Sequence, residues 1–527
     1  MKSNRLSVIY MITLFLTAIS LNSCTKDYEK INTQPDAIIA DQLGSAQIGQ
    51  VFARVQYTTM TSSFEVTQNL FADMFSQYYA LTRQSFNSDR YVNVASWASG
   101  AFSAFYSGVG KDLSFIESLS EKNQLPLQNA VIKVWKANAY HRITDYWGPV
   151  PYSEVGSGKV SIKYDTQESI YTDLFKILDE AIVVLKANQG KTVFAADDLL
   201  YKGDVNKWLA FANSLKLRLA LRIKYANPAL AKTHAEKAVA DGVMLANSGN
   251  AFVFTSINNL DPLGNISNFD NWRMSTSMES IMVGYDDPRI SQYWEPVVVD
   301  LRKDGRQYHG LRNGQKVEDM SGGPQNESHS KIDIKWWQPA RGGSNPPLLV
   351  MNAAEVYFLR AEGALAGWSM GGTAQALYEK GIETSIQQTT TASAGVIASY
   401  ISSTKIPVAI NDVYKTPAVS NIPVAYGSTG TAERQLEQII TQKWIAMFPN
   451  GWEAWTEARR TGYPKYLPRL NSDNPDVPKD VMIRRINYSE GEVTSNPDGL
   501  KAAQALPELA SRGGDKNSTR LWWDKKP

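Results

Sequence analysis

The stretch VNKWLAFANSLKLRLALRIKYANP, residues 205–228, indicates the fold class of this chain. It runs from Val205 to Tyr225 without a glycine or a proline, and apolar side chains recur along it. The run stops at Asn227-Pro228, because the residue before a proline is disfavoured in the helical conformation. The stretch therefore predicts one long helix over about residues 205–225.

Similar segments lie on both sides of it. From Ile170 to Leu185 the apolar residues follow steps of three and four, as a helix with one buried face requires. Asp165 or Thr166 is expected to cap the start of that helix. On the other side, ALAKTHAEKAVADG predicts a shorter helix that ends at Gly242.

The rest of the chain extends this pattern. Further helices are expected over residues 127–146, 348–368, 374–388 and 434–448. Consecutive antiparallel helices with short breaks resemble tetratricopeptide-type pairs, although no strict repeat period is present. Residues 300–347 are rich in loop signals, and residues 460–527 show little periodicity. The predicted fold class is all-α, mainly helical, with an irregular loop-rich part and few short strands.

The composition excludes several classes of function. A net charge of +2, from 54 basic and 52 acidic residues, makes nucleic acid an unexpected partner. A single cysteine rules out internal disulfides, and four scattered histidines argue against a zinc or iron site. GWSMG at 367–371 matches a nucleophile motif, but a helix precedes it and every histidine lies upstream of Ser369. No catalytic residue, metal site or cofactor is expected.

The N-terminus reads as an export signal. Residues 1–23 combine Lys2 and Arg5 with an apolar run, the arrangement of a secretory signal peptide. The run ends in Leu21-Asn22-Ser23-Cys24, which resembles the processing and lipidation site of bacterial lipoproteins. Cys24 is therefore the expected lipid attachment site, and acyl chains there would anchor the protein without a membrane-spanning helix. Residues 24–527 are predicted to form the mature domain.

Aromatic residues carry the expected binding chemistry. Sugar rings have apolar faces that stack on aromatic side chains, and hydroxyls that need directional polar partners. Two regions, 74–97 and 272–337, place aromatic residues among such partners. We expect about half of the rings in the first region to be core, and at most one of the adjacent pair Trp336 and Trp337 to face a ligand. The candidate ligand-binding residues are Tyr78, Tyr79, Phe86, Tyr91, Trp97, Trp272, Arg273, Tyr308, Trp336 and Trp337.

Seven short stretches, in order along the chain, resemble one known family. They are INTQPD (31–36), ITDYWGPVPYSE (143–154), DDPRI (286–290), NAAEVYFLRAEGAL (352–365), WEAWTEARRTGYP (452–464), IRRINYSEGEVTSN (483–496) and RLWWD (520–524). Together they are similar to the SusD/RagB family, in its SusD-like branch of outer-membrane lipoproteins of Bacteroidota. The resemblance spans essentially the whole mature chain.

This resemblance implies a non-catalytic protein with tetratricopeptide-like helix pairs. Such a protein would be lipid-anchored in the outer membrane, facing the extracellular side. It would bind oligosaccharides, or peptides in some members, and act as the lid of a SusC-like TonB-dependent transporter. The family's binding pocket varies, so the aromatic candidates rest on the stacking argument alone. Trp452, Trp455, Arg459 and Arg460 are expected to pack and pair internally, as are Arg484 and Arg485.

A different class of function remains open at this point. A surface-lipoprotein glycoside hydrolase needs only two carboxylates, which can lie anywhere in the sequence. With 52 acidic residues in the chain, no pair can be singled out. Binding is favoured because no recognisable catalytic pattern is present.

Overall fold

The computed structural model describes most of the chain. Described residues are 45–83, 86–316, 319, 326–337, 339–427 and 430–526. The expected signal peptide and Cys24 lie outside them. Contacts divide the chain into Met1–Ile48 and Gly49–Pro527, and the account below concerns the second unit, called the body.

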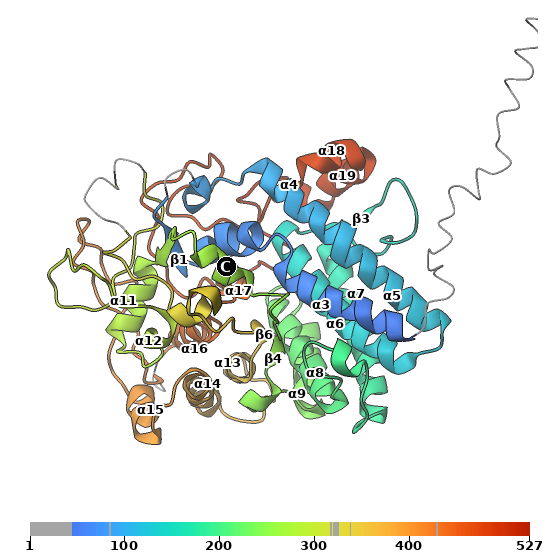
Figure 1. Cartoon of the computed structure of the whole chain (residues 1–527), viewed down its shortest axis with the longest axis horizontal. Coiled ribbons are helices and arrows are strands. Elements are labelled where there is room, and N and C mark those ends of the chain that lie inside the picture. The colour runs from blue at the N-terminus through green and yellow to red at the C-terminus, as the bar shows by residue number, and fades with distance from the viewer. Residues whose placement is uncertain are drawn as a thin grey trace, which may run out of the picture. The chain divides into compact units, whose positions relative to one another are not determined.

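Antiparallel helix pairs form one side of the body. Consecutive helices from α5 to α9 pack against one another, and α13 packs against α14 in the same way. Figure 1 shows α5, α6 and α7 side by side, with α8 and α9 beneath them. Their bounds are α5 Lys111–Lys122, α6 Pro126–Trp147, α7 Gln167–Ala187, α8 Val205–Arg222, α9 Pro228–Asp241, α13 Ala353–Leu365 and α14 Ala374–Thr389. The predicted mainly helical fold class is confirmed.

Helix ends follow the local signals in the sequence. The Thr166 hydroxyl accepts a hydrogen bond from the Ser169 amide at 3.1 Å and begins α7, as expected. At the start of α8, Asp204 caps the helix, accepting from the Asn206 amide at 2.9 Å. Gly242 ends α9 with a φ of 102°, a conformation that favours glycine. The end of α8 differs from the prediction, since the helix ends at Arg222 and not near residue 225.

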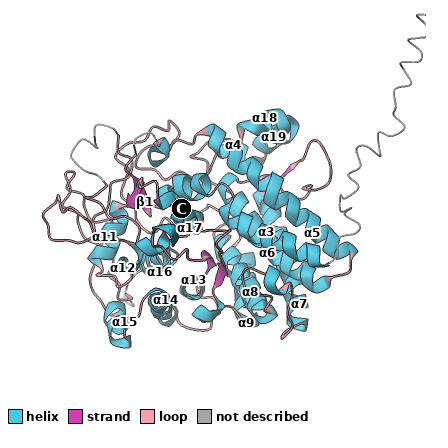
Figure 2. Ribbon diagram, in the orientation of Figure 1, coloured by secondary structure: helices cyan, strands magenta, loops and turns pink. Residues whose placement is uncertain are grey.

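Other helices and short strands complete the body (Figure 2). Described strands pair two by two: β1 with β5, β2 with β3, and β4 with β6, all antiparallel. The strands are β1 Tyr79–Leu81, β2 Val150–Pro151, β3 Tyr164–Asp165, β4 Ala251–Val253, β5 Trp272–Met274 and β6 Leu348–Met351. The remaining α-helices are α3 Ser45–Thr61, α4 Ala95–Ala104, α10 Pro262–Ser267, α11 Thr276–Gly284, α12 Ile290–Tyr293, α15 Ala394–Ile401, α16 Ala432–Ala446, α17 Gly451–Thr461, α18 Glu490–Ser495, α19 Pro497–Gln504 and α20 Pro507–Ala510.

Two segments depart from the expected helix pattern. The sequence predicts a helix over residues 348–368, but residues 348–351 form β6, which pairs with β4, and α13 begins only after Asn352. The Asn352 side chain accepts from the Glu355 amide at 2.8 Å, so a helix cap separates strand from helix. Near the C-terminus, α18 to α20 are helices too short for sequence periodicity to reveal.

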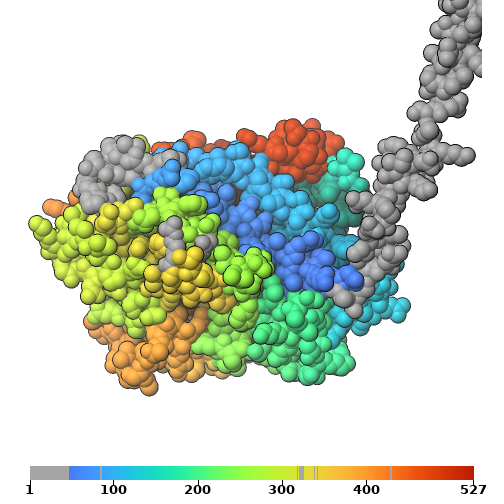
Figure 3. Space-filling model, viewed as in Figure 1, coloured from blue at the N-terminus to red at the C-terminus, as the bar shows by residue number. Residues whose placement is uncertain are grey.

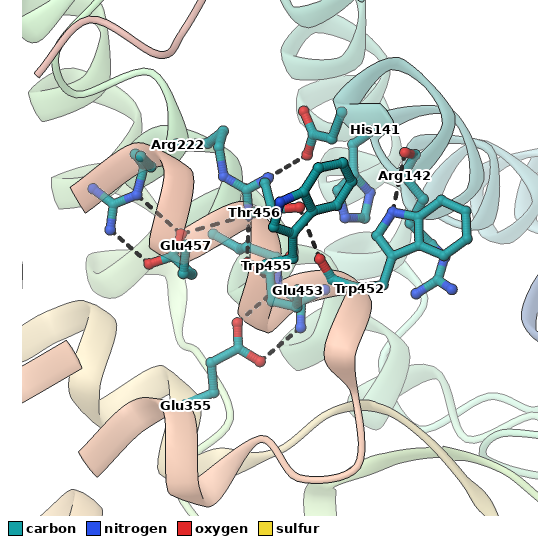
Figure 4. A network of polar contacts seen from close by, with 12 residues as sticks. His141, Arg142, Arg222, Glu355, Trp452, Glu453, Trp455, Thr456 and Glu457 are labelled. Carbon is teal, nitrogen blue, oxygen red and sulfur yellow. Dashed lines mark hydrogen bonds and ion pairs between the residues drawn. The ribbon is translucent and has the colours of Figure 1, made fainter. Parts of the chain in front are cut away.

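A buried network of charged residues joins the helix pairs (Figure 4). Arg222 of α8 binds both Asp145 of α6 and Glu453 of α17, and its side chain is fully buried. Arg218, one turn earlier, binds Glu355 of α13 at 2.6 Å. Oppositely charged partners are needed because an unpaired charge in this interior would be strongly destabilising. Four helices distant in sequence are thereby tied together.

The tryptophans and arginines of α17 belong to this interior, as the sequence predicted. Trp452, Trp455, Arg459 and Arg460 are all buried. The Arg459 guanidinium lies 3.6 Å from the ring centroid of Trp455, and Arg460 binds Glu362 at 2.6 Å. None of the helices in the described part of the chain is long and apolar enough to cross a membrane.

Candidate ligand-binding site

A short β pairing brings the two aromatic regions of the sequence together. Strand β1 pairs with β5, and Leu81 lies opposite Trp272. The segments around residues 80 and 270, blue and yellow-green in Figure 3, therefore lie side by side on the visible face. Side chains separated by almost two hundred positions in sequence meet at this junction.

Three of the predicted residues form a cluster there. The ring centroids of Phe86 and Trp97 are 6.0 Å apart in an edge-to-face arrangement, and those of Phe86 and Trp272 are 6.3 Å apart and stacked. Phe86 and Trp97 are half-buried, whereas Trp272 is 6% exposed. The exposed Arg83 carries its guanidinium 5.7 Å from the Phe86 ring centroid. Phe86, Trp97 and Trp272, called the aromatic cluster below, combine apolar ring faces with a nearby cation.

A narrow cavity lies beside Trp272 and is also lined by Tyr79, Arg273 and Trp337. Within the described part of the chain, the Tyr79 hydroxyl and the Trp272 indole N–H are buried without a hydrogen-bond partner. The same is true of the side-chain oxygen of Asn69, which lines the cavity too. The cavity has about 10 Å³ of room for the centre of a water molecule, roughly what one water needs. One water or hydroxyl group could satisfy these atoms.

Ionisation at this cavity is set by burial. Desolvation raises the pKa of Tyr79 well above its ordinary value, so its hydroxyl remains protonated and able to donate. Burial also lowers the pKa of Arg273, but Asp270 opposes that shift and binds the guanidinium at 2.8 Å. Lys331, which the sequence analysis missed, lies 4.9 Å from the ring centroid of Trp337. No local sequence pattern marks Lys331, because its position at the cavity depends on how the chain folds.

The remaining candidates lie elsewhere in the body. Tyr78 is fully buried and donates its hydroxyl to the Trp444 carbonyl at 2.5 Å. Tyr91 is also buried, with the Arg469 guanidinium 3.7 Å from its ring centroid. These two rings pack in the interior and present no face to a ligand.

Two further candidates are partly accessible. Trp336 is half-buried and meets Phe448 edge-on at 5.9 Å, while its indole N–H donates to the Gln292 carbonyl at 3.3 Å. Tyr308 is half-buried in the loop-rich part. Of the adjacent tryptophans, Trp337 lines the cavity beside the aromatic cluster and Trp336 does not.

One group of side chains has the composition of a metal site. Asp300, Asp304 and His309 bring ligand atoms within 4.8 Å of one another. However, Asp300 accepts the Lys303 amide at 2.7 Å, and Asp304 accepts the Arg306 amide at 3.1 Å and contacts His309. The second ring nitrogen of His309 has no partner among described residues, whereas a metal-binding histidine normally donates from it. The hydrogen bonds of Asp300, Asp304 and His309 therefore stabilise the loop of residues 300–309, and no metal ion is needed to explain their proximity.

Comparison with known proteins places the whole body in one family. The family model described as "SusD-like: Susd and RagB outer membrane lipoprotein" matches residues 30–524. The chain belongs to the SusD-like family. No curated protein sequence matches it significantly.

Solved structures of SusD homologues resemble this SusD-like chain over nearly its full length. A chitin-binding SusD homologue from Flavobacterium johnsoniae is 35% identical, with a TM-score of 0.81, covering 91% of this chain and 99% of that one. A SusD homologue from Bacteroides uniformis is 33% identical, with a TM-score of 0.81 and coverage of 92% and 100%. One from Bacteroides thetaiotaomicron is 31% identical, with a TM-score of 0.80 and coverage of 91% and 99%.

Family membership decides several of the sequence predictions. SusD-like proteins are outer membrane lipoproteins that bind ligands and do not catalyse reactions. The resemblance seen in the sequence is thus confirmed, and the glycoside hydrolase alternative is set aside. Arg485 and the buried residues of α17 are structural, which agrees with their assignment to internal packing.

Proposed function

We propose that this SusD-like lipoprotein captures oligosaccharides at the cell surface through the aromatic cluster. In this proposal it acts as the lid of a SusC-like TonB-dependent transporter and passes the glycan to it for import. Peptides are the alternative ligand class. The protein would face the extracellular side of the outer membrane, held there by lipid on Cys24.

The single observation that carries the glycan assignment is the aromatic cluster. Phe86 and Trp97 are half-buried, so each ring is held in place yet keeps some accessible surface. Their arrangement around Trp272 offers an apolar surface of the kind that stacks on sugar C–H faces. Arg83 adds a donor for sugar hydroxyls at the edge of this surface.

Relatives indicate which glycan to test first. The homologue from Flavobacterium johnsoniae is described as chitin-binding, and a further structural match, 28% identical with a TM-score of 0.76, is described as a chitin-binding protein. Chitin oligosaccharides are therefore the first probe for this chain, alongside other plant and microbial glycans.

The binding test compares two aromatic substitutions. Trp97→Ala removes a ring of the cluster, and Phe254→Ala removes a ring that is 52% exposed and lines none of the described pockets. We expect Trp97→Ala to weaken glycan binding about tenfold or more, while Phe254→Ala leaves it unchanged. Binding would be measured on a glycan array and by calorimetry. Unchanged affinity of Trp97→Ala would refute the assignment, and an array with only peptide hits would favour the other ligand class.

The transporter partnership has its own test. Affinity-tagged protein purified from the outer membrane of its native host in mild detergent should bring a TonB-dependent barrel protein with it. Cys24→Ala protein, purified in parallel, controls for association that depends only on the shared membrane. Recovery of the wild-type protein without any such transporter, even after cross-linking, would contradict the lid proposal.

A further inference from the structure

A second pocket lies away from the aromatic cluster and shares no residue with it. It is formed by the loop around Tyr414, between α15 and α16, and by the segment that holds Arg312 and Gln315. Its volume is about 480 Å³, within the range of roughly 300–1,000 Å³ typical of small-molecule sites. None of its described lining residues was among the sequence-predicted binding residues.

The loop on one side of this pocket is held in place by its own hydrogen bonds. Asp412 accepts from the amides of Tyr414 at 3.1 Å and Thr416 at 2.9 Å, and from the Thr416 hydroxyl at 2.7 Å. The Ile410 amide donates to the Thr416 carbonyl at 2.8 Å and closes the loop. Because the loop is already ordered, a ligand that binds here loses little free energy to ordering it.

The Tyr414 ring is fixed on two sides. The Arg312 guanidinium lies 5.8 Å from its ring centroid, and Arg312 is itself held by the Thr416 hydroxyl at 2.7 Å and the Pro468 carbonyl at 2.8 Å. Burial and a hydrogen bond to Asp319 raise the pKa of Tyr414 to about 12, so the hydroxyl stays protonated. A rigid aromatic ring that lines a polar pocket is a platform suited to the apolar face of a sugar.

Gln315 supplies an unsatisfied polar group. It is 7% exposed and lines the pocket, and its side-chain oxygen has no hydrogen-bond partner within the described part of the chain. Its main chain is fixed, since its carbonyl accepts from Arg90 at 3.0 Å. Buried acceptors of this kind are normally paired, and a hydroxyl group of a ligand would pair this one. Asn411 places a second amide at the exposed rim of the pocket.

We propose that this pocket is a second carbohydrate site, which takes one sugar ring stacked on Tyr414 with a hydroxyl bound to Gln315. Amide side chains both donate and accept hydrogen bonds, as neighbouring sugar hydroxyls require. The site extends the proposed function but does not depend on the aromatic cluster for its contacts. Two sites on one chain would allow the protein to hold a longer glycan at two points or two chains at once.

The test measures how many short oligosaccharides the full chain binds. Calorimetry with chitotriose, cellotriose, maltotriose and xylotriose would be run on the lipoprotein purified in detergent. Gln315→Leu removes the amide with little change of shape, and Tyr414→Ala removes the ring. Val298→Ala, at a side chain that is 78% exposed and outside the pocket lining, is the matched control. Melting temperatures of all variants would confirm folding.

The expected result is two bound molecules per wild-type chain for at least one trisaccharide. Gln315→Leu and Tyr414→Ala should each weaken one of the two sites tenfold or more, and Trp97→Ala should weaken only the other. The second site is refuted if Gln315→Leu and Tyr414→Ala both bind as the wild type does, if the wild type binds no trisaccharide, or if it binds a single molecule whose affinity only Trp97→Ala weakens. If Trp97→Ala has no effect but Gln315→Leu abolishes binding, this site stands and the aromatic-cluster assignment fails.

Discussion

The buried charge network predicts a large cost for removing a single charge. Glu453 is 3% exposed and binds Arg222, with Arg218 at 3.9 Å. Glu453→Gln keeps the shape of the side chain, so it creates no cavity and isolates the loss of the charge. Removing one partner of a buried ion pair costs about 3–5 kcal/mol. We expect the low end, about 3 kcal/mol, because Asp145 and Glu457 still face Arg222.

Urea unfolding, followed by tryptophan fluorescence, measures this cost. The control is Lys237→Gln, which removes the exposed ion pair with Asp241, whose lysine side chain is 59% exposed. That pair should contribute no more than about 0.5 kcal/mol, because water and salt screen it. A loss in Glu453→Gln as small as that in Lys237→Gln would refute the view that the network holds the helix pairs together.

The same network predicts a dependence of stability on pH. Burial opposes ionisation of Glu453, but Arg222 and Arg218 outweigh it and hold its pKa below the ordinary value of 4.5. A carboxyl whose pKa is lower in the folded state stabilises the fold above its unfolded pKa, and that contribution is lost as the pH falls. The wild type should therefore lose stability below about pH 4.5, and Glu453→Gln should lose less over the same range. Equal pH profiles for the two proteins would contradict this assignment.

Three further outcomes can be measured on single variants. Cys24→Ala should move the protein from the membrane fraction to the soluble fraction; retention with the lipid would disprove the anchor. Trp455→Ala should lower the free energy of unfolding by about 3–5 kcal/mol, since its fully buried ring contacts Arg459. Thr166→Ala should cost about 1 kcal/mol through the lost cap of α7, and a circular-dichroism melt that matches the wild type would count against that cap.

Local features of this protein could be predicted from its sequence. The spacing of apolar residues predicts α7 and α8, and residues such as Thr166 and Gly242 predict where helices begin and end. Helix formation and helix capping can be predicted because each depends on residues only a few positions apart. The order of the seven short family stretches is enough to indicate SusD-like membership from the sequence. At residues 348–351 the same reasoning was wrong, because pairing with β4 overrides local preference.

The binding surfaces depend on contacts between distant parts of the chain. The sequence does not separate binding from core positions among Tyr78, Tyr79 and Trp97. In the structure, Tyr78 packs against Trp444, Tyr79 lines a cavity, and Trp97 belongs to the aromatic cluster. The pocket at Gln315 and Tyr414 had no signal in sequence at all. Sequence alone determined most of the long helices and the family, and it predicts the export signal, since these features are encoded locally or in ordered motifs. Only the tertiary structure decided which rings and charges are buried, because burial is a property of the packed chain and not of any one segment.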